Sequence, residues 1–133
     1  MAQPDFDRLI ADVQRNRREI VRDVERCVRR AALEIKKGWQ RRLNTGGTTR
    51  HLPAVARGIR YDVDTEPGVT EATIGGGPQA AGPLAHVIEL GNIEYGSVRS
   101  KPHLYGLRAL LDETPQFERA VGDAADNLFR ETA

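Results

Sequence analysis

Apolar residues recur at helical intervals through the first third of the chain. Between Asp5 and Leu43 there is no proline and one glycine, Gly38. Apolar positions in this stretch follow one another at steps of three, four or seven residues, which is the spacing of one helix face: Phe6, Ile10, Val13, Ile20, Val24, Cys27, Ala31, Ile35 and Trp39. The pattern predicts an amphipathic helix over 5–43, ended by the turn that Gly46 and Gly47 indicate.

This helix is long for a chain of 133 residues. At about 1.5 Å per residue it spans about 58 Å, whereas a domain of this size has a radius of gyration of about 13–14 Å. We therefore expect either that part of the helix packs on another chain or that it bends. The candidate positions for a bend are Gly38 and Arg17, where the apolar stripe is interrupted.

The next part of the chain alternates as strands do. Val55, Ile59, Tyr61 and Val63 share one parity, which predicts a half-buried strand. Residues 65–68 carry the turn sequence Thr-Glu-Pro-Gly, and 69–74 form a second strand-like run. The pattern predicts an antiparallel β-hairpin over 54–75, followed by a loop through the glycines and prolines of 75–83.

The last part of the chain predicts helices separated by loops. We expect loops over 76–101, interrupted by a short helix at 84–90, and C-terminal helices over 102–131. Pro102 opens the first of these, and Thr114-Pro115 separates it from the last. We expect three leucines of the first to form the core that docks it on the sheet: Leu104, Leu107 and Leu110. The predicted fold class is α+β, one domain over 1–133 with a long N-terminal helix, a small antiparallel sheet, and C-terminal helices packed on the sheet.

Composition narrows the class of protein. Hydrophobic residues make up 39% and charged residues 29%, which favours a folded domain with a modest core. No run is apolar enough for a membrane span, and acids near the N-terminus argue against a secretory signal. The single Cys27 excludes an internal disulfide and is interpreted as a small core residue.

The formal net charge of +1 hides an uneven distribution. Residues 1–50 hold 13 Lys+Arg and 7 Asp+Glu, whereas residues 51–133 hold 7 and 12. Such polarity favours head-to-tail attraction between copies, and a basic helix face can also meet phosphate or simply be solvated. The candidate basic interaction face consists of Arg15, Arg18, Arg22, Arg26, Arg29 and Lys36.

Candidate catalytic groups are few. His86 and Glu89 are three residues apart and share a helix face, as metal ligands sometimes do, but a structural histidine is the commoner case. The Gly75–Gly77 run lacks the Lys-Ser/Thr of a phosphate loop, and Pro78 removes a backbone donor. We predict that the protein is not an enzyme and has no catalytic residue, metal or cofactor.

Two short motifs lie in the C-terminal half. The first is Ile88-Glu89-Leu90-Gly91, and the second runs Pro102-His103-Leu104-Tyr105-Gly106-Leu107-Arg108-Ala109-Leu110. They resemble the Val-Glu-Phe-Gly-Thr and Pro-Phe-Leu-Arg-Pro-Ala-Leu elements of the neck or tail-completion family of long-tailed bacteriophages, minor tail proteins often named after the tenth gene product of a lambda-like coliphage. Leu90 replaces the Phe and Asn92 the Thr, and the second motif has looser spacing and no second proline.

The resemblance implies a structural virion protein of the head–tail junction, made in the host cytoplasm. Such proteins form rings, commonly hexamers, between the head connector or stopper and the tail terminator or tail tube, and DNA passes through the ring. No membrane partner is implied. The family motif or assembly residues are then Ile88, Glu89, Leu90, Gly91, Pro102, Leu104, Leu107, Arg108 and Leu110. By this analogy Glu89 is structural, accepting hydrogen bonds or pairing with an arginine at a chain junction; the alternative is an exposed glutamate at a helix end.

Other functions stay open on the sequence alone. A tail terminator, which caps the tail tube, shares most of these features. A nucleic-acid-binding module would use the basic N-terminal helix, and its affinity would fall steeply with salt. An enzyme is the weakest alternative, because it depends on His86 and Glu89 alone.

Overall fold

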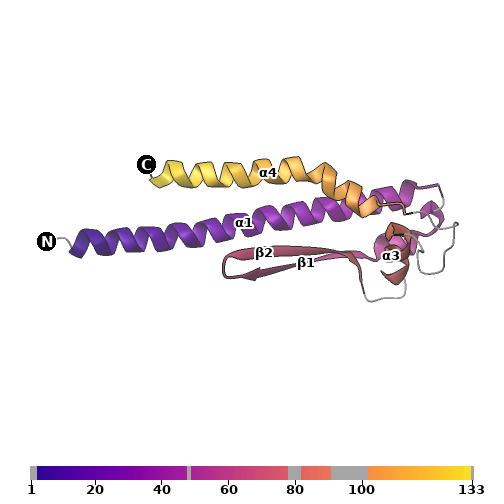
Figure 1. Cartoon of the computed structure of the whole chain (residues 1–133), viewed down its shortest axis with the longest axis horizontal. Coiled ribbons are helices and arrows are strands. Elements are labelled where there is room, and N and C mark those ends of the chain that lie inside the picture. The colour runs from indigo at the N-terminus through magenta and orange to yellow at the C-terminus, as the bar shows by residue number, and fades with distance from the viewer. Residues whose placement is uncertain (1–2, 48, 78–81, 91–101, 133) are drawn as a thin grey trace.

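A computed structural model of the chain describes residues 3–47, 49–77, 82–90 and 102–132. In chain order the elements are helix α1 (Gln3–Thr45), the 3₁₀ turn η1 (Thr49–His51), helix α2 (Pro53–Arg57), strands β1 (Ile59–Glu66) and β2 (Val69–Gly76), and helices α3 (Gly82–Leu90) and α4 (Tyr105–Thr132). Figure 1 shows α1 in the middle of an elongated molecule, with α4 along one side and the β1–β2 hairpin along the other. The predicted α+β class is confirmed. No helix in the described part has a stretch apolar enough to cross a bilayer.

Helix α1 is continuous over 43 residues and has no break at Gly38 or Arg17. The glycine has another role, because a Cβ at position 38 would lie 3.2 Å from the Cβ of Ala109 in α4. Gly38 therefore allows α4 to approach α1 closely. Of the two alternatives for this long helix, the bend at these positions is wrong, and the apolar residues Leu9, Ile10 and Val13 of its N-terminal third are exposed.

The two strands pair antiparallel from Ile59 opposite Gly76 to Glu66 opposite Val69, with the turn at Pro67 and Gly68. The hairpin thus begins later than predicted, because 53–57 form helix α2. Pro53 suits the first helical position, and the helix buries the adjacent residues Val55 and Ala56 together, which a strand would place on opposite faces.

The segment after the hairpin also differs from the predicted loop. Gly75 and Gly76 belong to β2, and α3 includes Gly82 and Pro83. Residues 78–81 and the whole second predicted loop, 91–101, lie outside the described residues. The short helix predicted at 84–90 is present as part of α3.

Helix α4 is one helix of 28 residues with Pro115 inside it, not two helices separated there. Proline has no N–H for the carbonyl of Leu111, and Leu111 is exposed, so water can bond that carbonyl. The Thr114 hydroxyl donates to the carbonyl of Leu110 at 2.8 Å. Figure 1 shows the helix bending in its first half, as helices do near proline.

The buried core lies at the end of the molecule where α1 terminates. It joins α1, α2, β1, α3 and α4 through Ile35, Trp39, Leu43, Val55, Ala56, Ile59, Ala85 and Ala109. Helix α4 packs mainly along α1, and Leu110 meets Ile74 of β2 across a shared groove. The predicted leucine core is wrong in one respect: Leu107 and Leu110 are 44% and 45% exposed, and Ala109 is the buried residue of this turn.

Candidate assembly site

The carboxylate of Glu89 caps the N-terminus of α4. Its Oε2 accepts a hydrogen bond from the backbone N–H of Gly106 at 2.8 Å, and its Oε1 accepts one from Leu107 at 3.0 Å. These donors belong to the first turn, where no helical carbonyl is available, and a negative charge there also interacts favourably with the helix dipole. Because Glu89 is only 8% exposed, it is a structural acceptor within its own chain and not an exposed helix end.

Backbone hydrogen bonds join the same two segments. The N–H of His103 donates to the carbonyl of Ile88 at 3.1 Å, and the N–H of Leu104 donates to the carbonyl of Glu89 at 3.2 Å. Leu104 has φ 54°, a left-handed conformation that costs energy for a side chain with a Cβ. Its carbonyl also accepts from Arg108 in the first turn of α4 at 3.0 Å, so bonds on both sides hold this conformation. The two motifs therefore form one junction.

Gly106 lets this junction rest on Trp39. A Cβ at position 106 would lie 2.8–2.9 Å from three atoms of the Trp39 ring, closer than real contacts allow. Trp39 belongs to α1 and is buried, so the first turn of α4 is fixed on α1 at the same place where Glu89 caps it. The sequence did not predict the contact between Gly106 and Trp39, although Gly106 lies inside a predicted helix and a glycine there can indicate a close approach.

Three leucines of the motifs are exposed around this junction. Leu90 is 58% exposed, and Leu107 and Leu110 are nearly half-exposed. Leu107 and Leu110 line a groove of about 180 Å³ together with Ile74 and Trp39.

The remaining motif residues have mixed surroundings. Ile88 is half-buried and packs on the core, and Leu104 is half-buried. Pro102 and Arg108 are exposed. Gly91 lies outside the described residues.

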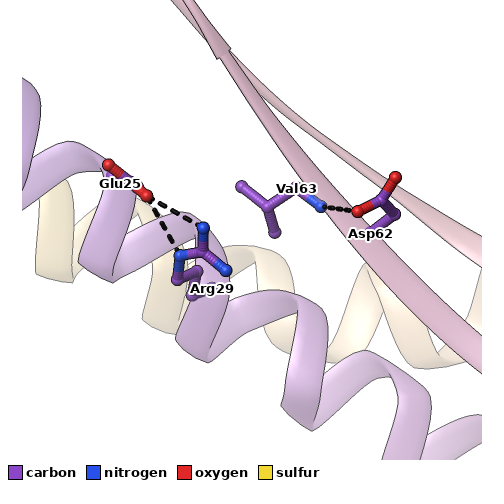
Figure 2. A network of polar contacts seen from close by, with 4 residues as sticks. All are labelled: Glu25, Arg29, Asp62 and Val63. Carbon is purple, nitrogen blue, oxygen red and sulfur yellow. Dashed lines mark hydrogen bonds and ion pairs between the residues drawn. The ribbon is translucent and has the colours of Figure 1, made fainter.

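The predicted basic face lies along α1, but much of it is neutralised locally. Arg15, Arg26 and Arg29 each form an ion pair with an acid three or four residues earlier in the helix. Figure 2 shows the pair of Arg29 with Glu25, at 2.9 Å, beside the hairpin. Arg18 and Arg22 line a groove at the hairpin tip. Lys36 lies apart from them, over the ring of Tyr61 at 5.8 Å.

One carboxylate between α1 and α4 has a shifted pKa. Burial raises the pKa of Glu113, and the nearby carboxylate of Glu34 raises it further. Arg30 opposes both effects. Cys27, which was predicted to be a core residue, is half-buried and lines a groove with Glu113 and Phe117.

His86 and Glu89, the candidate metal pair, lie on α3. Both oxygens of Glu89 accept backbone hydrogen bonds, and its side chain is buried, whereas His86 is exposed. Within the described ranges, no three His, Cys, Asp or Glu side chains gather as metal ligands would.

Comparisons with protein-family models, with curated proteins and with solved structures find no match for this chain.

Proposed function

We propose that the protein is a ring-forming neck or tail-completion subunit at the head–tail junction of a tailed bacteriophage. The proposal begins from the resemblance of 88–91 and 102–110 to that family. It treats the two motifs as parts of a structural element, and it assigns no catalytic step to any residue.

The observation that carries the proposal is the outward apolar surface built around the motif junction. Glu89 and Gly106 fix the two segments together, while Leu90, Leu107 and Leu110 are left exposed in the single chain. Large apolar side chains gathered on a surface are typical of sites that another protein covers. A motif that served only the core would bury these leucines.

Helix α1 supports assembly in a second way. Its apolar stripe continues beyond the hairpin tip to Val13, Ile10 and Leu9, all of which are exposed. A single chain thus exposes apolar side chains both at the motif junction and on the N-terminal third of α1, the part of the helix that extends past the hairpin in Figure 1. A subunit whose copies contact each other through different surfaces can close into a ring by rotation.

The proposal is tested by deleting the coding sequence from the phage that carries it. Filled heads and free tails should accumulate unjoined, and supplying the protein in trans should restore joined particles. Side-chain-resolution imaging of those particles should place the protein between the connector and the tail terminator. Infectious particles that form without the protein would overturn the proposal, and density at the tail-tube end alone would assign it the terminator role instead.

A further inference from the structure

Two segments of the chain carry an excess of opposite charge. Residues 34–60 hold seven Lys+Arg and one acid, Glu34, and they form the end of α1, η1, α2 and the first residues of β1. Residues 61–77 hold four acids and no Lys or Arg, and they form most of the hairpin. The basic part therefore lies at the core end of the molecule, and the acidic part lies on the arm that extends back along α1 (Figure 1).

The acids of the hairpin are exposed. Asp62, Asp64 and Glu71 are exposed, whereas the alternate residues Val63 and Ala72 are half-buried toward the helix. Asp64 lies directly opposite Glu71 in the strand register, and like charges in that position repel each other. None of these three acids has an ion-pair partner among the described residues.

The basic end of the molecule, defined by Arg41, Arg57 and Arg60, carries an excess of positive charge. These three side chains are exposed, and in the described ranges none of them forms an ion pair. The side chain of Gln40 donates to the carbonyl of Ala56 at 2.9 Å, which places the adjacent residues Arg41 and Arg57 at the same end of the molecule.

Arg60 of this basic end lies within reach of Asp62, two residues away and about 7 Å along β1 at about 3.3 Å per residue, but not of Asp64. Asp64 is four residues from Arg60 along β1, about 13 Å at about 3.3 Å per residue. That separation exceeds the screening length of about 8 Å at physiological ionic strength. The charges that remain on both surfaces are therefore available to another molecule.

We propose that the outer face of the hairpin, with Asp64 and Glu71, docks on the basic end of a second copy, with Arg41 and Arg57. The inference rests on the proposed ring and identifies the two surfaces that join its neighbouring subunits. Each copy contributes one surface of each sign, which is the requirement of a repeating head-to-tail contact. A nucleic acid would satisfy the basic end but would repel the hairpin, so the second copy matches more of the observed charge.

The test uses two charge-reversed variants of the whole chain. One carries Asp64→Lys with Glu71→Lys, and the other carries Arg41→Glu with Arg57→Glu. All four side chains are exposed, so circular dichroism should show both variants folded. In sedimentation velocity at low salt, we expect the wild type to associate and each variant to associate at least about tenfold more weakly.

Mixing the two variants is the decisive measurement. The reversed hairpin of one matches the reversed basic end of the other, and the unaltered surfaces match as before, so an equimolar mixture should recover association. A mixture that stays dissociated, or a wild type that stays monomeric at every concentration, would overturn the inference. Normal association of the hairpin variant alone would also overturn it, and duplex DNA added to the wild type would then show whether the basic end serves nucleic acid.

A matched control changes the same charges elsewhere. Glu118→Lys with Asp126→Lys alters two exposed acids of α4 by the same total charge and should associate as the wild type does. Equal weakening by this control would show a net-charge effect and would overturn the inference. Particle joining separates the two proposals: recovery in the mixture without any role in joining heads to tails would leave the docking contact and remove the neck function.

Discussion

Replacing Glu89 by alanine is expected to destabilise the first turn of α4. The substitution leaves the backbone N–H groups of Gly106 and Leu107 without the carboxylate that accepts from them at 2.8 and 3.0 Å. Loss of a helix N-cap costs about 0.5–2 kcal/mol, and a buried donor left unpaired costs about 1–3 kcal/mol. Water can reach part of this turn, because Leu107 is half-exposed. We therefore expect the free energy of unfolding to fall by about 2–4 kcal/mol.

Thermal and chemical unfolding measure this loss. The unfolding entropy for 133 residues makes 1 kcal/mol equivalent to about 3–4 °C, so the expected fall in Tm is about 7–14 °C. Glu89→Gln keeps one carbonyl oxygen and should lose about half as much. Hydrogen exchange should locate the change, with faster exchange of the Gly106 and Leu107 amides than of amides later in α4.

A control variant shows whether the effect belongs to the cap. Glu118→Ala removes an exposed carboxylate from α4 and should change the free energy of unfolding by less than about 0.5 kcal/mol. If Glu89→Ala were as mild as this control, or if the first-turn amides kept their protection, the capping argument would be wrong.

Three further changes probe the packing between α1 and α4. Gly106→Ala should lower the free energy of unfolding by about 1–3 kcal/mol, because its Cβ would collide with the ring of Trp39, and urea titration measures the loss. Gly122→Ala, by contrast, meets nothing within 4 Å and should raise it by about 0.5–1 kcal/mol through helix propensity. Glu113→Gln should stabilise the protein at pH 7, because the pKa of Glu113 is raised in the folded state and its charged form is therefore disfavoured there. The folded wild type binds this proton more tightly than the unfolded chain, so its stability should rise as the pH falls through the raised pKa. The variant should lack this rise, which urea titrations at pH 7 and pH 4.5 measure.

The elements that the sequence predicted well depend on local spacing. The apolar stripe of α1 and the alternation in 59–74 each repeat over many residues, so the helix and the hairpin followed from periodicity. Helix α2 was not predicted from periodicity, because Val55 has the same parity as the buried positions of the strand that follows and was assigned to that strand. The choice between the two is decided by the burial of both Val55 and Ala56, which is a tertiary contact.

The orientation of α4 was predicted least well, again because long-range contacts determine it. Leucine spacing alone favoured burial of Leu107 and Leu110. The close approaches of Ala109 to Gly38 and of Gly106 to Trp39 instead turn the small residues toward α1. A pattern of apolar positions does not show which side of a helix will meet a glycine in another element.

The capping role of Glu89 was foreseen only in outline. The resemblance implied a hydrogen-bond acceptor, but no spacing rule connects residue 89 to the donors of Gly106 and Leu107, which lie 17 and 18 residues later. An N-cap normally comes from the residue just before its helix. Here that position belongs to Leu104, whose side chain has no acceptor, so the cap comes from α3.

The charge split has a different physical meaning once the chain is folded. Dividing the sequence at residue 50 assigned the positive excess to the whole N-terminal helix, but three of the arginines in its first thirty residues have an acid one turn away. Such exposed pairs are weak, yet they cancel the local field that a distant partner would meet. Of the seven Lys and Arg residues in 34–60, Lys37 and Arg42 are paired with Glu34 and Asp112, and the other five have no ion pair among the described residues, while the opposing acids stand on the hairpin. A partner that is attracted by both surfaces must itself carry both signs at a similar separation, and a second copy of the chain meets that condition without any further assumption.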